Sequence, residues 1–184
     1  SKEIINAIRA KKPIRYKILY LWMIFRWTFL TNITYKNIKK LIKRYKLTPQ
    51  NTVLYSFWFH FLALCVALFD NKFALKISRA HGSDLYEELY PQPCKDFIVK
   101  NLDVVFACSK MGADYINKRY KTNKARCSYL GTFNWFSTSR IKKRDDIFRI
   151  VSCGRLTSVK RIHKIVDALC YIKDKRIHWT HIGD

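Results

Sequence analysis

Short apolar runs alternate with helical segments over most of the chain, and this alternation constrains the fold more than any other feature. The apolar runs have the length of strands and occupy residues 52–57, 73–78, 104–108, 127–130, 148–153 and 178–182. Helical patterns lie between them at residues 59–69, 95–101, 109–120 and 160–172, with Ser109 as a suitable N-cap. Strands that alternate with helices predict an α/β protein with a doubly wound parallel sheet.

The first fifty residues are basic and aromatic. Residues 14–30 are largely apolar but contain Arg15, Lys17 and Arg26, and a cation near the centre of a bilayer costs about 2.5–3.5 kcal/mol. We therefore expect a helix that lies against the core or on a membrane surface rather than a span. Residues 35–46 predict a second, basic helix. Its apolar face would be formed by Ile38, Leu41, Ile42 and Tyr45, surrounded by Lys36, Lys39, Lys40, Lys43 and Arg44.

The net charge is +23, from 36 Lys and Arg residues against 13 Asp and Glu residues. Such a charge attracts polyanions such as nucleic acid, anionic lipid headgroups and phosphorylated substrates. The six cysteines, at positions 65, 94, 108, 127, 153 and 170, form no C-x-x-C pair. We expect buried free thiols in a reducing compartment rather than a zinc site or a disulfide framework.

One strand–turn–helix unit carries residues typical of a phosphate site. Its sequence, FRIVSCGRLTSVKRI at residues 148–162, begins with an apolar run that ends at Gly154. A glycine lets the backbone approach an anion, and the start of the following helix offers N–H groups. Arg155 and Lys160 add two cations, one with a planar fork of donors and one as a point charge. The unit therefore predicts a site for a phosphate or diphosphate.

The same residues carry a family resemblance. The block from Gly154 to Lys160 resembles the opening of the donor-binding domain in the retaining glycosyltransferases of family four, also called group one. The sequence HWTHIGD at residues 178–184 resembles the strand and turn that follow there. KISRAHGSDLY at residues 76–86 resembles a segment of the polysaccharide-building members of that family. The likeness covers roughly residues 53–184.

The resemblance implies the GT-B fold, in which two doubly wound domains face each other across a cleft. Residues 1–142, with basic helices at residues 1–50, would be the latter part of the acceptor-side N-terminal domain. Residues 143–184 would be the first strand–helix–strand of the Rossmann-like, donor-nucleotide-binding C-terminal domain. The family's N-terminal glycine-rich loop and its later pair of glutamates are not found in the sequence. We therefore expect part of a longer enzyme that is inactive by itself.

The activity implied is transfer of a sugar from a nucleotide-diphosphate sugar to a glycan or lipid-linked acceptor in cell-surface polysaccharide synthesis, with retention of configuration. Gly154, Arg155 and Lys160 would bind the donor diphosphate. His81 would face the reacting sugar, so that His81, Arg155 and Lys160 are the candidate catalytic residues. Because protein cations would stabilise the leaving group, no metal or other cofactor is expected.

Neighbouring residues leave alternatives open. Asp84 either orients His81 or a basic neighbour, or is only a turn residue. Arg79 either meets phosphate or pairs with Asp84. The other candidate ligands, His163, His178 and His181, have no cysteine or carboxylate at ligand spacing, so a metal site is not expected there.

The alternative function is that of a basic, non-enzymatic protein that binds nucleic acid or a membrane, which the charge and the interleaved aromatic residues suggest. The sequence contains no signature of an RNA- or DNA-binding module, so no nucleic-acid partner is expected. It also contains no signal-peptide pattern. The expected location is cytoplasmic and peripheral, at the inner face of the cell membrane, because the basic N-terminal half suits an anionic membrane surface.

Overall fold

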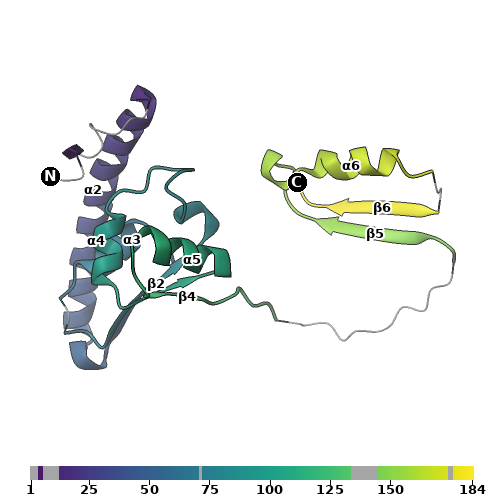
Figure 1. The fold of residues 1–184 in the computed structure, drawn as a ribbon. Helices are drawn as coiled ribbons and strands as arrows, with labels where there is room; N and C mark the ends of the chain where they lie inside the picture. Colours follow the sequence, from purple (N-terminus) through teal and green to yellow (C-terminus); the bar gives the residue numbers. More distant parts are fainter. Residues whose placement is uncertain (1–3, 6–12, 71, 134–144, 174–175) are drawn as a thin grey trace. The chain divides into compact units, whose positions relative to one another are not determined.

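The computed structural model describes residues 4–5, 13–70, 72–133, 145–173 and 176–184 (Figure 1). The chain separates into two compact units, Ser1–Thr132 and Phe133–Asp184. The domain boundary predicted between residues 142 and 143 lies outside the described residues.

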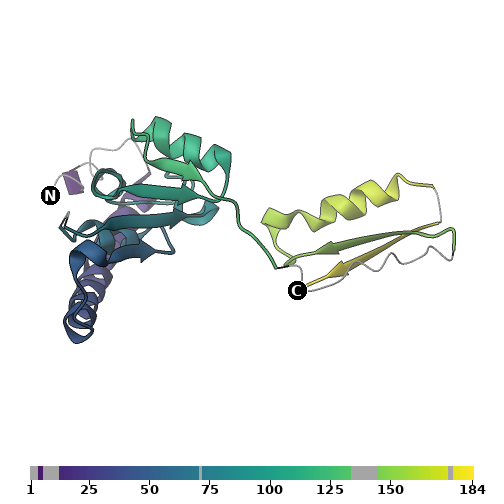
Figure 2. The same ribbon diagram turned by 90° about the horizontal axis from the view of Figure 1, so that it is seen from below.

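The first unit is built on a four-stranded parallel sheet (Figure 2). Its strands pair in chain order and are β1 (Val53–Ser56), β2 (Leu75–Ala80), β3 (Val104–Ala107) and β4 (Ala125–Cys127). The helices that connect successive strands are α3 (Phe61–Ala67), α4 (Lys95–Asn101) and α5 (Lys110–Arg119). The predicted α/β class and parallel sheet are therefore confirmed, and the arrangement is compatible with a Rossmann-like fold.

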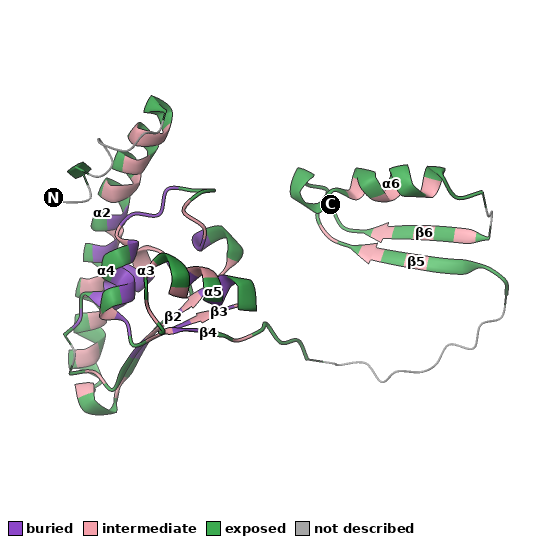
Figure 3. Ribbon diagram, viewed as in Figure 1, coloured by how far each residue is buried: buried purple, intermediate pink, exposed green. Residues whose placement is uncertain are grey.

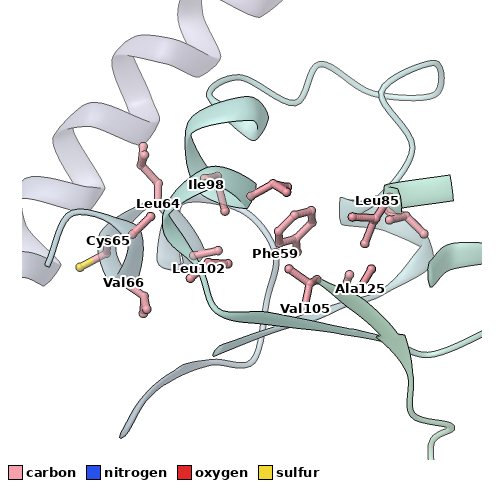
Figure 4. Packing of buried hydrophobic residues seen from close by; sticks show 14 of the residues in the cluster. Phe59, Leu64, Cys65, Val66, Leu85, Ile98, Leu102, Val105 and Ala125 are labelled. Carbon is pink, nitrogen blue, oxygen red and sulfur yellow. The ribbon is translucent and has the colours of Figure 1, made fainter. Parts of the chain in front are cut away.

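The core of this unit lies between the sheet and its connecting helices. Phe59, in the segment between β1 and α3, is fully buried and lies close to Val105 of β3 (Figure 4). Ile98 of α4 and Ile116 of α5 are also fully buried. The predicted N-cap of α5 is confirmed, because the Ser109 hydroxyl accepts a hydrogen bond from the Gly112 N–H at 3.1 Å. Apolar burial and capping thus fix the helices against the strands.

A single helix, α2 (Ile14–Arg44), replaces the two helices predicted at residues 14–30 and 35–46. The intervening residues contain neither proline nor glycine. The Thr31 hydroxyl is buried and donates to the Phe61 carbonyl oxygen at 3.1 Å, which fixes this part of α2 against α3. The Thr34 hydroxyl donates to the Leu30 carbonyl oxygen within α2. Tertiary packing therefore keeps α2 helical through residues 31–34, whose helix propensity is low.

The second unit is a parallel pair, β5 (Phe148–Cys153) and β6 (Ile177–Ile182), with α6 (Ile162–Cys170) packed along it (Figures 1 and 2). A 3₁₀ turn at Ser158–Lys160 precedes α6. No described residue of this unit is buried. Only one face of the pair is covered, which leaves Val151 and Ile182 exposed on the other.

Several predicted element bounds differ from the observed ones; β2, for example, was predicted at residues 73–78 and lies at Leu75–Ala80. Strand β4 lies at Ala125–Cys127 instead of residues 127–130, because the Asn117 side chain bonds both the N–H and the carbonyl of Ala125 and holds that residue beside α5. Helix α6 begins at Ile162 instead of Lys160, because Arg161 has a left-handed φ of 52° that interrupts the helical path. It also ends at Cys170 instead of Ile172.

The prediction that the cysteines are buried was also wrong for most of them. Cys65 is buried, whereas Cys127, Cys153 and Cys170 are exposed. Two of the exposed thiols lie in the second unit, where a single helix and two strands cover little surface. All six cysteines are free thiols.

We predict that the backbone amides of β5 and β6 exchange hydrogen at least about tenfold faster than those of β2 and β3, because opening the second unit exposes little buried apolar surface. Hydrogen-exchange mass spectrometry of the whole chain measures both sheets in one sample, so that each serves as the reference for the other. Equal protection of the two sheets would contradict this expectation.

Candidate functional site

In the first unit, three ring side chains meet at the carboxyl ends of β1 and β2. Phe57 and Trp58 follow β1, and His81 follows β2. The centroid of the His81 ring lies 4.4 Å from that of Trp58 and 5.0 Å from that of Phe57. The His81 side chain is only 14% exposed, whereas Phe57 and Trp58 are 51% and 38% exposed. We call these three residues the aromatic shelf; it lies at the sheet edge where parallel α/β proteins bind ligands.

Asp84 holds the two loops of the shelf together. Its buried carboxylate accepts a hydrogen bond from the Phe59 N–H at 2.7 Å and another from the His81 N–H at 2.6 Å. The same carboxylate lies 3.8 Å from Nδ1 of His81, too far for a hydrogen bond. That buried Nδ1 has no hydrogen-bond partner among the described residues. Of the alternatives that the sequence left open, the structure places Asp84 beside His81, whose backbone it orients.

Lys95 was missed by the sequence analysis. It begins α4, is 2% exposed, and its ammonium donates to the carbonyl oxygens of Phe59 and Asp84, the latter at 2.6 Å. Burial lowers the pKa of Lys95 to about 7, and the nearby Asp84 opposes that shift. The sequence contained one signal for this role, namely the position of a lysine in the first turn of a predicted helix. A cation there interacts unfavourably with the helix dipole, which indicates that other contacts stabilise it.

His60 lies beside the shelf in a neutral state. Its ring stacks on those of Trp58 and Phe61, with centroids 5.9 Å and 4.6 Å away. Burial lowers the pKa of His60 to about 4, with smaller opposing and reinforcing contributions from Asp84 and Lys95. Its Nδ1 accepts from the Leu62 N–H at 3.3 Å, which leaves the proton on Nε2. A hollow of about 280 Å³ adjoins it, and Arg26, Tyr90 and Gln92 contribute to its wall.

The Arg79 side chain binds the segment that follows β4 rather than Asp84. Its guanidinium donates to the carbonyl oxygens of Ser128 at 2.7 Å and Tyr129 at 3.3 Å, just after β4. Of the two alternatives that the sequence left open for Arg79, pairing with Asp84 is not the arrangement seen. The side chain instead ties β2 to the segment that follows β4.

In the second unit, Gly154 lies at the carboxyl end of β5, as the sequence predicts. Its N–H donates to the Ile182 carbonyl oxygen at 3.0 Å, and the Leu156 N–H donates to that of Asp184 at 2.9 Å. Gly183 has a φ of 134°, and a Cβ atom there would lie 2.2 Å from the Gly154 carbonyl oxygen. Glycine is therefore required at position 183, where the two strand ends approach closely.

Arg155 and Lys160 are both exposed around this turn. A hollow of about 300 Å³ lies nearby, and its wall includes the hydroxyl residues Thr157 and Ser158 and, at the start of α6, His163. Neither Arg155 nor Lys160 lines it. Arg161, at the N-cap of α6, is a third cation at this helix start, which the sequence analysis did not single out.

A series of hydrogen bonds between side chains of β5 and β6 stabilises the turn at Gly154. Nε2 of His181 lies 2.9 Å from the Gly154 carbonyl oxygen, which can only accept, so this nitrogen carries the proton. Nδ1 of His181 then accepts from the Ser152 hydroxyl at 2.8 Å, and the Trp179 indole N–H donates to the same hydroxyl oxygen. His181 is thus a structural partner of Gly154. In the described part of the chain, no group of three or more His, Cys, Asp or Glu side chains is arranged to hold a metal.

No family model matches the chain, and no curated protein matches it significantly. Its two candidate regions therefore have to be interpreted by their own chemistry. The aromatic shelf offers two exposed apolar rings, Phe57 and Trp58, whose planes are 86° apart, together with the His81 imidazole. The glycine turn offers cations and hydroxyl groups at a helix start, which suit an anion.

We predict that Asp84→Ala lowers the free energy of unfolding by about 2–4 kcal/mol, because two buried N–H groups lose their charged acceptor. Asp114→Ala is the matched control, since Asp114 is an exposed carboxylate in the middle of α5. Its effect should stay within about 0.5 kcal/mol. Urea unfolding followed by circular dichroism measures both variants, and equal losses would contradict the role given to Asp84.

We predict that the protein loses stability on acidification from pH 6.5 towards pH 4 and that His60→Gln reduces this loss. The pKa of His60 is lowered from 6.5 to about 4 in the folded state. In that window the unfolded chain binds a proton that the folded protein does not, so the free energy of unfolding falls as the pH falls. Thermal unfolding at a series of pH values, with His163→Gln as the exposed control, measures the difference. An unchanged pH slope in His60→Gln would refute the assignment.

Proposed function

We propose that the chain is part of a retaining glycosyltransferase of GT-B architecture that transfers a sugar from a nucleotide-diphosphate sugar to a glycan or lipid-linked acceptor. In this proposal the first unit belongs to the acceptor-side domain and the second unit begins the donor-binding domain. The observation that carries it is the glycine turn at the end of β5, followed by Arg155, Lys160 and the start of α6. The resemblance of the sequence blocks around residues 81 and 154 supports the same assignment.

On the donor side, the proposed role of the turn follows from the charge that the reaction creates. Breaking the bond between the sugar and the diphosphate leaves an anionic nucleoside diphosphate. Arg155 and Lys160 would neutralise that charge from two sides of the turn, and the N–H groups at the start of α6 would add to them. No metal ion is needed in this scheme, because the cations of the protein perform the neutralisation.

On the acceptor side, the proposed role of the aromatic shelf is to position a sugar ring. The C–H groups on one face of a sugar are apolar and pack well on exposed aromatic rings such as Phe57 and Trp58. His81 would then face the reacting sugar with its imidazole as a hydrogen-bonding group. We assign His81 no nucleophilic role, since Asp84 and the two rings hold it in place without activating it as one.

We predict that, in the complete protein that contains this chain, Arg155→Ala and Lys160→Ala each lower the rate of sugar transfer by about a hundredfold, as loss of one charge-stabilising group often does. Lys164→Ala is the matched control, because Lys164 is an exposed cation of α6 that pairs with Asp167. Transfer from uridine and guanosine diphosphate sugars, measured by release of the nucleoside diphosphate, tests all three variants. Wild-type rates in both Arg155→Ala and Lys160→Ala would overturn the proposal.

A further inference from the structure

Helix α2 has an uncovered apolar face. Ile14, Ile18, Trp22, Phe25 and Phe29 follow one another at intervals of three or four residues, which places them on one side of the helix. All five are exposed, Phe25 by as much as 72%. Monomeric soluble proteins rarely expose a continuous apolar stripe of this kind unless it binds something. Figure 3 shows exposed and half-buried residues along most of α2, with its buried residues confined to the middle.

The same side of α2 becomes basic towards its carboxyl end. Lys36, Lys40 and Lys43 continue the line of the apolar residues at the same helical spacing. Helix α2 contains no Asp or Glu, and its cations are Arg15, Lys17, Arg26, Lys36, Lys39, Lys40, Lys43 and Arg44. We call this side, from Ile14 to Lys43, the outer face of α2. It combines a long apolar stripe near the start of α2 with positive charge near its carboxyl end.

The side opposite the outer face is already occupied. Trp27 and Thr31 are buried there, and Ile38 and Ile42 are half-buried against the core. The sequence had assigned the apolar contact of a basic helix to Ile38, Leu41, Ile42 and Tyr45. Since two of these four pack against the core, the apolar surface left for a partner lies instead on residues 14–29.

We propose that the outer face of α2 binds an anionic lipid bilayer, with its apolar half inserted among the headgroups and its basic half against their charges. An interfacial helix of this type is apolar on one face, aromatic at the interface and rich in Lys and Arg. Anionic headgroups complement Lys36, Lys40 and Lys43, the cations that lie on this face. The binding would be peripheral: no helix in the described residues is long and apolar enough to span a bilayer.

A second copy of the chain fits the outer face less well. Pairing two α2 helices side by side would bring eight cations of one helix near eight of the other, with no carboxylate on either helix to balance them. Antiparallel pairing would place the lysines of one helix on the apolar stripe of the other, which removes their hydration without a partner charge. A bilayer avoids both costs, because its anionic groups and its apolar interior lie at different depths.

The test is binding of the whole chain to vesicles of phosphatidylcholine alone and to vesicles in which about a third of the lipid is phosphatidylglycerol. We expect the anionic vesicles to bind the chain at least about tenfold more tightly, and less so as salt rises. Phe25→Ser with Phe29→Ser should weaken that binding at least about tenfold, because the inserted rings are lost. Lys36→Gln with Lys40→Gln should weaken it several-fold and reduce its salt dependence.

Matched controls distinguish binding through the outer face from nonspecific binding to vesicles. Leu89→Ser with Met111→Ser removes two exposed apolar side chains elsewhere in the first unit, and Lys110→Gln with Lys118→Gln removes two exposed cations of α5. Both pairs should bind like the wild type. The proposal is overturned if the Phe25 and Phe29 variant binds anionic vesicles normally, since the apolar stripe is then not inserted. It is equally overturned if sedimentation shows a dimer that this variant abolishes, because a second copy then covers the face.

Discussion

Two buried charged residues hold together the edge of the sheet on which the first candidate site depends. The Asp84 carboxylate fixes the N–H groups of Phe59 and His81, and the Lys95 side chain fixes the carbonyl oxygens of Phe59 and Asp84. Phe59 is therefore held at both its N–H and its carbonyl oxygen, while its ring is buried in the core. Removing either charge would leave the other buried without its neighbour, which is far more costly than replacing both together. The position of the aromatic shelf follows from this arrangement.

The two units are stabilised in different ways. In the first unit, side chains such as Ile98, Leu102 and Val105 are removed from water, so apolar burial fixes the strands and leaves polar groups to orient the loops. In the second unit no described side chain is buried, and the turn after β5 is defined by hydrogen bonds through Ser152 and His181. These hydrogen bonds are only partly buried, so they compete with water and contribute little net stability. The anion site proposed at Gly154 therefore has a defined shape but a weakly held scaffold.

Sequence patterns located the strands and the glycine turn but not the contacts between distant residues. The predicted bounds of α4 and β5 equal the observed ones, because both elements have clear periodicity and lie between turn residues. His81 and Gly154 were placed correctly at strand ends, since parallel strands end at a common edge. The continuity of α2 depends on a bond from Thr31 to Phe61, and the role of Lys95 on bonds to Phe59 and Asp84. Local sequence patterns do not identify the partners of such long-range contacts.

The charge of the surface depends on how the first unit uses the few carboxylates of the chain. Several of the few carboxylates of the chain are used inside the first unit: Asp84 binds backbone N–H groups, Asp103 accepts from the Lys76 N–H, and Glu87 binds Arg119 and Tyr120. Carboxylates engaged in this way already have partners of their own. The chain has 36 basic and 13 acidic residues, and its net positive charge therefore lies largely at the surface. A chain built like this retains its fold while presenting positive charge to any anionic substrate or membrane it meets.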